Sequence, residues 1–205
     1  MRKEVLSKNQ LELLPLVKQF SREYYLVGGT AIALYIGHRR SIDFDLFKHT
    51  LLKHKNIVLK ISAFNYPYTI TRRVKEQMNV IVHDAKFTFF EYPFKIEAKQ
   101  KFENIIRMPT LIDLAAMKAY ALGRRSKWKD YVDLYFILKD YFTVEQISKK
   151  ACEIYDQLFS EKLFRAQLSY FDDIDYSESV EYLIPAVSEN EMKAFLIEKS
   201  TDINL

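Results

Sequence analysis

The stretch VGGTAIALYIGHRRSIDFDLF, residues 27–47, decides the fold of the first half of the chain. It begins at the end of YYLV, residues 24–27, a short apolar segment with the pattern of a strand. Gly28 and Gly29, two of only four glycines in 205 residues, separate this strand from TAIALYIG, residues 30–37, whose pattern predicts a helix that ends at Gly37. IDFDLF, residues 42–47, then alternates apolar and acidic residues as a β-strand does. The order strand, glycine turn, helix, strand predicts an α/β unit.

The glycine pair allows two readings. Glycine lets the backbone N–H groups face outward and lets a phosphate approach closely, and a helix N-terminus adds a partial positive charge. Thr30 would then cap the helix or touch the phosphate. The spaced glycine and Gly-Lys-[Ser/Thr] ending of a Walker loop are absent. A plain tight turn between strand and helix is the alternative.

Asp43 and Asp45 lie one residue apart, so period-two geometry places both carboxylates on one face of their strand. Two such charges repel one another unless a cation bridges them, and Mg²⁺ favours carboxylate oxygens while keeping positions for water and phosphate. An exposed strand with two solvated acids is the alternative. The glycine turn 14 residues before Asp43 favours the metal-site reading.

The remaining pattern predicts an α/β fold of the α+β type, in which a small mixed sheet of about five strands with helices precedes an α-helical lobe. We place the lobes at residues 1–105 and 106–205, with the boundary region at 94–108. The further strands are expected in YTITRRV, NVIVHD and KFTFFEY, with a turn at His83-Asp84-Ala85. The expected helices cover residues 4–20, 48–61, 109–138 with a break near Gly123, 143–170 and 188–198.

Composition is typical of a globular protein. Hydrophobic residues make up 49% and charged residues 28% of the chain, and its net charge of +4 permits a polyanionic partner without requiring one. Neither a membrane-spanning run nor a signal peptide is apparent, and Cys152 is the single cysteine. We expect a cytoplasmic, reducing location without membrane contact, and Cys152 as a small core residue rather than a nucleophile.

The motifs resemble those of a known family. GGTAIALYIGHRRSIDFDLF resembles the first motif of the polymerase-β-like nucleotidyltransferases, and it is closest to the AbiEii-type enzymes, the toxins of type IV toxin–antitoxin and phage-abortive systems. LIDLAAMKAYALGRRSKWKDYVDLYFIL, residues 111–138, is similar to that family's later motifs, and QLSYFDDID, residues 167–175, to its C-terminal region. The resemblance implies transfer of a nucleoside monophosphate from an NTP to an acceptor hydroxyl, with Mg²⁺ or alternatively Mn²⁺ as the cofactor.

The resemblance also assigns roles to residues. It implies Asp43 and Asp45 as metal ligands, Lys118 as a phosphate ligand and Asp130, flanked by Lys129 and Asp133, as an active-site acid. The nucleotide-binding set comprises Gly28, Gly29, Thr30, Arg39, Ser41 and Lys118. As the acceptor it implies first an RNA, at a tRNA 3′ end, and second a protein hydroxyl. A cognate antitoxin is a further expected partner. In this hypothesis the helical lobe brings Lys118 and Asp130 across a cleft from the aspartate pair.

Several of these residues have simpler readings. Lys118 would extend to solvent from an apolar helix, or point inward and need an anionic partner. Asp130 and Asp133 would pair with Lys127 and Lys129. Arg39 would bind phosphate or brace an aspartate. One cluster of basic residues would contact an RNA backbone or remain solvated: Arg124, Arg125, Lys127 and Lys129.

One position departs from the polymerase-β-like pattern. A third carboxylate is expected on the strand KFTFFEY, where this chain has Thr88, and neither Glu91 nor Asp84 has the register to replace it. Either Asp130 supplies the acid or the protein has weak or no activity. The second hypothesis is therefore an inactive nucleotidyltransferase-fold module that binds a nucleotide or a partner.

Overall fold

The protein, seen here as a computed structural model that describes residues 1–202, divides into two compact units. The first unit is Met1–Thr110 and the second is Leu111–Leu205. The predicted boundary between residues 105 and 106 lies before this division, because the strand at residues 106–108 still belongs to the sheet of the first unit. Each unit is described by itself.

Unit 1 is built on one seven-stranded mixed sheet with the order β3-β4-β5-β2-β1-β7-β6. Two neighbouring pairs, β2–β5 and β1–β7, are parallel, and the other pairs are antiparallel. The strands are β1 Tyr25–Val27, β2 Asp43–Lys48, β3 Tyr68–Val74, β4 Gln77–Val82, β5 Ala85–Glu91, β6 Gln100–Phe102 and β7 Ile106–Met108.

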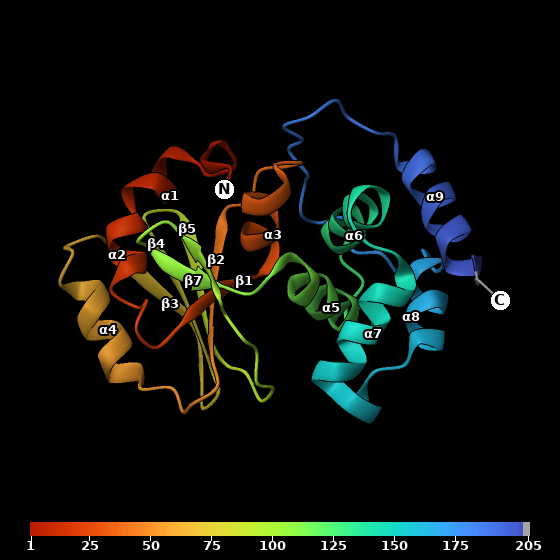
Figure 1. Cartoon of the computed structure of the whole chain (residues 1–205). Helices are drawn as coiled ribbons and strands as arrows, with labels where there is room; N and C mark the ends of the chain where they lie inside the picture. The colour runs from red at the N-terminus through yellow and green to blue at the C-terminus, as the bar shows by residue number, and fades with distance from the viewer. Residues whose placement is uncertain (203–205) are drawn as a thin grey trace. The chain divides into compact units, whose positions relative to one another are not determined.

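The alternation of the central strands divides the sheet into two different faces. Phe44, Leu46, Phe87 and Phe89 point to one face and are fully buried, and Phe20 packs on Phe89 with 4.8 Å between ring centroids. Helices α1 (Lys8–Glu12), α2 (Leu14–Lys18) and α4 (His54–Ser62) cover this face, whereas α3 (Gly28–Ile36) lies on the other (Figure 1). The buried phenylalanines of the sheet therefore lie on the side away from Asp43 and Asp45.

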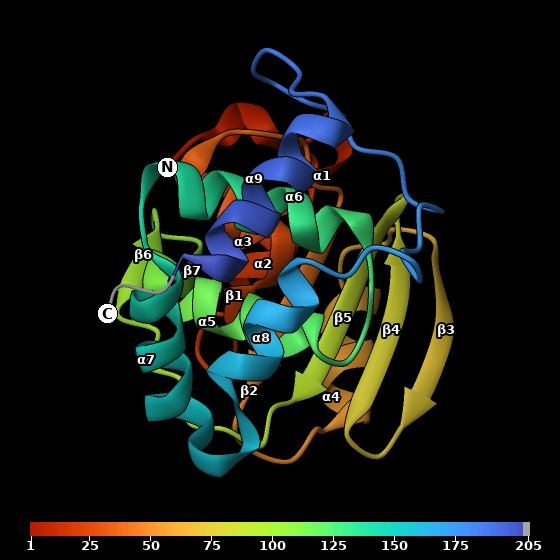
Figure 2. The same ribbon diagram turned by 90° about the vertical axis from the view of Figure 1, so that its right-hand side faces the viewer.

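The five strands predicted from the sequence are all present. The turn between β4 and β5 is at His83 and Asp84, whose φ angles of 47° and 64° are those of a type I′ hairpin. β6 and β7 were not predicted: each has three residues and, unlike the equally short β1, neither is followed by a glycine turn that marks its end. Strand β3 is exposed along its whole length and forms one edge of the sheet (Figure 2).

The N-terminal segment is not the single helix predicted for residues 4–20. A 3-10 turn, η1 (Lys3–Val5), is followed by α1 and α2. Ser7 begins α1 through a capping box with Gln10, and Pro15 lies in the first turn of α2. The interruption shifts the helical phase, so Leu11 is 41% exposed although Leu14 and Val17, which recur at helical spacing from it, are buried.

Two further predictions in unit 1 concern helix ends. Helix α3 ends at Gly37, whose φ of 75° is the left-handed C-terminal conformation. Helix α4 begins at His54, so the first residues of the helix predicted at 48–61 belong instead to the end of β2 and a loop. The end of α3 was therefore predicted correctly and the start of α4 was not.

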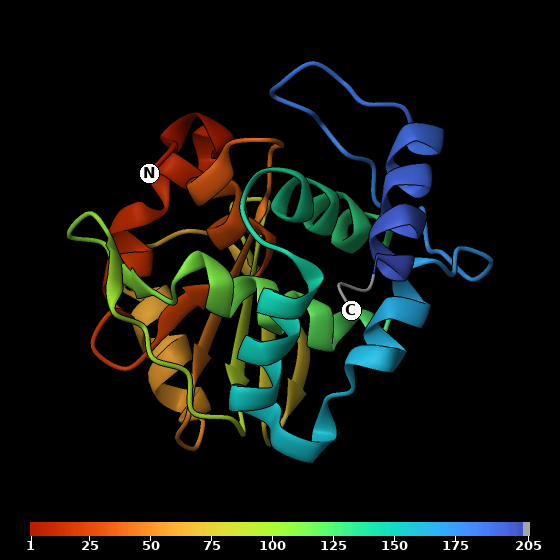
Figure 3. The same cartoon turned by 45° about the vertical axis from the view of Figure 1, so that its right-hand side comes forward.

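Unit 2 is helical, as predicted. Its helices are α5 Leu111–Leu122, α6 Trp128–Asp140, α7 Val144–Tyr155, the 3-10 turn η2 Asp156–Leu158, α8 Glu161–Leu168 and α9 Glu189–Thr201. Within it, α7, α8 and α9 lie next to one another (Figure 3). The segment predicted as helical at 143–170 is broken at Asp156, which has a φ of 49°.

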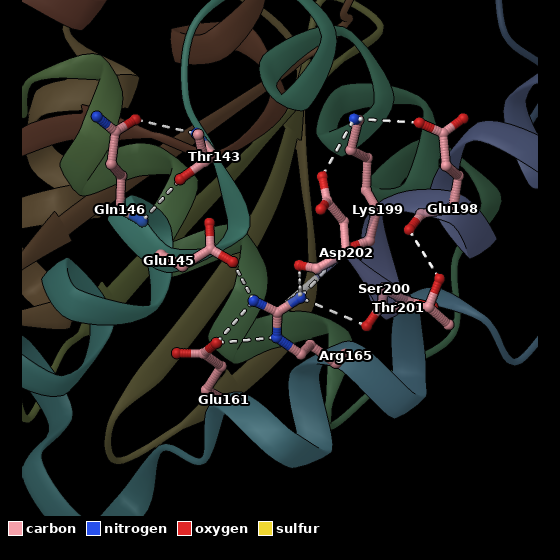
Figure 4. Close-up of polar contacts among 10 residues, drawn as sticks. All are labelled: Thr143, Glu145, Gln146, Glu161, Arg165, Glu198, Lys199, Ser200, Thr201 and Asp202. Carbon is pink, nitrogen blue, oxygen red and sulfur yellow. Dashed lines mark hydrogen bonds and ion pairs between the residues drawn. The ribbon is translucent and has the colours of Figure 1, made fainter. Parts of the chain in front are cut away.

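Arg165 on α8 joins three helices of unit 2 (Figure 4). Its guanidinium pairs with Glu161 at 2.8 Å and with Glu145 of α7. Its Nη1 also donates to backbone carbonyls at the end of α9, 3.2 Å from that of Lys199 and 3.0 Å from that of Asp202. A cation at a helix C-terminus satisfies carbonyls that have no partner inside the helix and interacts favourably with the helix dipole.

Cys152 is exposed, so the prediction of a core position is wrong. The buried side of α7 is formed by Val144, Ile147, Ser148, Ala151 and Tyr155, and Cys152 lies outside that stripe. Among residues 1–202, the structure contains no helix with the length and apolarity required to cross a bilayer.

The two faces of β5 predict different responses to the same truncation. Phe89→Ala removes a fully buried ring from the core and should lower the free energy of unfolding by about 3–5 kcal/mol. Phe90→Ala, on the half-exposed face, should cost clearly less. Urea unfolding of both variants checks this, and equal losses would contradict the different burial of the two phenylalanines.

Candidate functional site

The glycine pair is explained by two side chains that approach it. Gly28 has a φ of 72°, and a Cβ atom built on it would lie 2.1 Å from Asp45 Oδ2. A Cβ atom on Gly29 would lie 2.4 Å from Arg39 Nη2 and 3.3 Å from Ser41 Oγ. Any residue larger than glycine would displace these groups. The pair is therefore more than a turn, because it leaves room for the Asp45 carboxylate and the Arg39 guanidinium.

The N-terminus of α3 meets the requirements of an anion site. The helix begins directly at Gly28, has no side-chain cap, and carries no acid in its first turn. Its first N–H groups have no acceptor within the helix, and the helix dipole adds partial positive charge. These features favour the predicted phosphate-binding role of Gly28 and Gly29.

Thr30 does not cap α3, which corrects one of its two predicted roles. It is 1% exposed, its hydroxyl bonds to the carbonyl oxygen of Asp43, and it lies 2.9 Å from the Ser41 hydroxyl. These contacts tie the first turn of α3 to the start of β2. Arg39 is likewise buried, and its Nη1 donates to the carbonyl of Arg40 at 3.0 Å.

The two aspartates lie on the sheet face that carries α3. Both are half-buried. Phe44, which lies between them in the sequence, and Leu46, which follows Asp45, are fully buried on the opposite face. In residues 1–202 no third His, Cys, Asp or Glu joins them to complete a three-residue metal site. Mg²⁺ is often held by one or two carboxylates together with substrate phosphates and water, so the pair fits this ion as its protein ligands.

The register of β5 shows what stands at the third carboxylate position. Thr88 lies directly opposite Asp45 in the parallel β2–β5 pair, on the same face. Glu91 points to the other face and Asp84 lies in the hairpin turn, so the expectation that neither replaces the acid is confirmed. On the other side of Thr88 is Asn79 of β4.

Lys118 and Asp130 belong to a buried ion-pair network of unit 2. Lys118 Nζ lies 2.6 Å from Asp130 Oδ1 and 2.9 Å from Asp133 Oδ2, and Arg125 Nε lies 2.8 Å from Asp130 Oδ2. Lys118 is 5% exposed, so it points inward and does not extend to solvent. Two cations thus face two carboxylates, and we call these four residues the α5–α6 network.

The network changes the acidity of Asp130. Burial raises the pKa of this carboxyl, but the charges and hydrogen bonds of Lys118 and Arg125 outweigh burial and hold the pKa below its ordinary value of 3.8. Asp130 is therefore a carboxylate at neutral pH and a weakened proton acceptor.

The basic cluster after α5 is largely engaged within unit 2. Lys127 and Lys129 both pair with Glu178, so the alternative in which they neutralise Asp130 and Asp133 is wrong. Arg124 lies over the ring of Tyr120, 3.4 Å from its centroid. RNA contact by this cluster stays a prediction.

A methyl group at Gly28 tests the close approach of Asp45. Gly28→Ala should weaken Mg²⁺ binding at the aspartate pair by about 100-fold, because the added Cβ displaces the Asp45 carboxylate. Gly29→Ala should have a smaller effect on Mg²⁺ binding, since its added Cβ meets Arg39 and Ser41 and not an aspartate of the pair. Gly123→Ala is the control, because its Cβ would have 4.0 Å of clearance. Isothermal titration with MgCl₂ measures all three, and unchanged binding by Gly28→Ala would contradict the geometry.

Removal of one network carboxylate tests the buried ion pairs. Asp130→Asn should lower the free energy of unfolding at neutral pH by about 3 kcal/mol, because Lys118 and Arg125 each lose a partner. The folded-state pKa of Asp130 is depressed, so its stabilisation is complete above the ordinary value of 3.8 and disappears as the pH falls through the folded-state pKa. The difference between variant and wild type should therefore shrink below that pH.

Glu178→Gln is the matched control, because it also removes a carboxylate with two cationic partners in unit 2 but is partly exposed. It should cost less than about 1 kcal/mol. Equal costs for the two variants in urea unfolding would contradict a special role for the buried network.

Comparison with known proteins identifies the family. Residues 91–202 match the family model described as "Nucleotidyl transferase AbiEii toxin, Type IV TA system". An uncharacterised protein of Aquifex aeolicus is 31% identical over 181 residues, which cover 82% of this chain and 84% of the relative.

Two solved structures share the fold. A putative nucleotidyltransferase from Helicobacter pylori has a TM-score of 0.60 at 20% identity, with 95% of this chain and 94% of that chain covered. The nucleotidyltransferase toxin MenT4 from Mycobacterium tuberculosis has a TM-score of 0.60 at 14% identity, with 96% and 84% covered. The chain therefore belongs to the AbiEii family of nucleotidyl transferase toxins of type IV toxin–antitoxin systems.

Proposed function

We propose that this nucleotidyltransferase moves a nucleoside monophosphate from an NTP to an acceptor hydroxyl, with Asp43 and Asp45 as ligands of Mg²⁺ or Mn²⁺. The observation that carries the proposal is the placement of the Asp45 carboxylate against Gly28, at the uncapped N-terminus of α3. A carboxylate pair and an anion-binding helix end then serve one substrate, a metal-bound triphosphate. Mg²⁺ bound there would neutralise phosphate charge in the transition state.

The reaction forms a bond between the acceptor oxygen and the α-phosphorus. The bond from that phosphorus to the oxygen bridging the β-phosphate breaks, and pyrophosphate leaves. The N–H groups of Gly28 and Gly29 would hold the departing phosphates. The main contribution of these residues is to position and neutralise charge, as in phosphoryl transfer generally.

The proton of the acceptor hydroxyl needs a base, and Thr88 cannot serve. The roles predicted for Lys118 and Asp130 stay predictions. The ion pairs of the α5–α6 network restrict both roles. A phosphate would bind Lys118 in competition with Asp130 and Asp133. The lowered pKa of Asp130 favours an orienting role over proton abstraction.

For the acceptor we propose a tRNA 3′ end, and a protein hydroxyl as the second choice. Both rest on family resemblance, and the net charge of +4 favours RNA slightly. The cytoplasm supplies NTPs and tRNA and is the location we propose. A cognate antitoxin is the further partner that membership of a type IV toxin–antitoxin family implies.

One observation favours a second function. Thr88 occupies the position opposite Asp45 where a third carboxylate would activate the acceptor. A protein without that acid could bind the nucleotide or a partner without catalysing transfer. This alternative predicts NTP binding without turnover.

Transfer of label from an α-³²P-labelled NTP separates the two functions. The wild type, incubated with each of four NTPs, Mg²⁺ or Mn²⁺, total RNA and cell lysate, should label RNA or protein. Asp43→Asn and Asp45→Asn should each lower the rate by about three orders of magnitude or more, because metal and triphosphate are no longer held.

Asp84→Asn is the control for these variants. It makes the same change in the β4–β5 hairpin, and asparagine also tolerates the positive φ at this position. Full activity in both Asp43→Asn and Asp45→Asn would refute the site. Absence of transfer by the wild type, with NTP binding retained, would establish the inactive module instead.

A further inference from the structure

A row of aromatic side chains lies beside the aspartates on the same face of the sheet. In the strand register Tyr25 is opposite Phe47, and Phe47 is opposite Phe90. Phe47 follows Asp45 by two residues, so it shares that face and lies about 7 Å further along β2. We call Tyr25, Phe47 and Phe90 the aromatic row.

The rings of Phe47 and Phe90 are packed by their neighbours but are less covered than the rings of the core. The ring centroids of Phe47 and Phe90 are 5.2 Å apart in an edge-to-face arrangement, and Tyr92 lies 5.1 Å from Phe47. Phe47 and Phe90 are half-buried, in contrast to the fully buried phenylalanines of the opposite face. Neighbouring rings therefore hold both side chains in place while part of their surface stays accessible.

The hydroxyl of Tyr25 is the polar atom of the row. Tyr25 is 6% exposed, and its hydroxyl makes no hydrogen bond to any residue in the part of the chain that the structure describes. Burial raises the pKa of this phenol, so the hydroxyl keeps its proton and remains a donor. A buried hydroxyl without an acceptor destabilises the fold unless a ligand supplies one.

These features match the part of a nucleotide that the aspartate pair leaves unbound. In an NTP whose triphosphate lies at the aspartates and the N-terminus of α3, one ribose separates the α-phosphate from the base. The distance from phosphate to base is comparable to the distance from Asp45 to Phe47. Aromatic rings bind any base through its π-face, and a phenol donates to a ring nitrogen or carbonyl at the base edge.

We propose that the aromatic row is the nucleoside subsite, in which the base of the incoming NTP stacks on Phe47, Phe90 packs against the edge of the base, and the Tyr25 hydroxyl donates to its polar edge. This inference rests on the proposed function, because it takes the triphosphate at Asp43 and Asp45 as its neighbour. Stacking tolerates all four bases, so the row sets affinity for the nucleoside more than its identity.

The test compares an NTP with inorganic tripolyphosphate, which has the phosphates and no nucleoside. Both ligands are titrated calorimetrically with Mg²⁺ into the full-length wild type and Phe47→Leu, which keeps an apolar side chain and loses the aromatic face. Phe47→Leu should bind ATP about tenfold more weakly and tripolyphosphate with unchanged affinity. Phe64→Leu is the matched control, because Phe64 is a half-buried phenylalanine outside the row, and it should change neither affinity.

Tyr25→Phe provides the second variant, since it removes only the hydroxyl. It should weaken ATP binding about fivefold while stability to urea stays the same or rises, because an unsatisfied buried group is removed. If the Tyr25 hydroxyl had only a structural role, Tyr25→Phe would instead lower the stability to urea and leave the affinity for ATP unaltered.

The outcomes are distinguishable. Loss of ATP affinity with tripolyphosphate affinity retained supports the subsite. Unchanged ATP affinity in both variants overturns it and leaves the proposed function intact. Failure of the wild type to bind tripolyphosphate overturns the proposed function and the subsite together.

Discussion

The close approach of the Asp45 carboxylate to the backbone of Gly28 is the constraint on which the site of unit 1 depends. It requires a residue without Cβ at the exact point where β1 becomes α3, and a backbone φ of 72° that other residues rarely adopt. As a result, a carboxylate of β2 lies beside the first N–H groups of α3, which have no acceptor within the helix. Negative charge and positive partial charge are thereby held next to one another without a loop between them, as the proposed metal-bound triphosphate requires.

In unit 2, in contrast, the charged residues of the α5–α6 network are paired with one another. Lys118, Arg125, Asp130 and Asp133 compensate one another at distances of 2.6–2.9 Å, three of them almost entirely buried. A buried pair contributes little net stability compared with apolar packing, but loss of one partner is costly. These residues match the family's later motifs, so the same side chains carry a structural cost and a predicted role toward nucleotide. Any anion that reaches Lys118 must offset what Asp130 and Asp133 already provide.

On the face of the sheet that carries the aspartates, the side chains change from polar to aromatic along strands β2 and β5. Asp45 and Thr88 form one row, and Phe47 and Phe90 form the next. Thr88 occupies the position where a third carboxylate would activate the acceptor, so that acid is missing. The aromatic row, in contrast, has the rings and the hydroxyl that we propose to bind the nucleoside. Nucleotide binding and acceptor activation are thus separable properties, and the second hypothesis, a binding module, would keep the first without the second.

The sequence by itself determined the fold class, strands β1 to β5, the helical second half and the glycine turn, because each depends on local periodicity or on a residue with a special backbone. It did not show β6 and β7, the break at Ser7, or the exposure of Cys152, since these depend on partners distant in the chain or on helical phase. Only the tertiary structure placed Asp45 against Gly28, Thr88 beside Asp45 and Lys118 between two carboxylates. Strand register and helix packing decide which side chains meet, and neither is encoded within one segment.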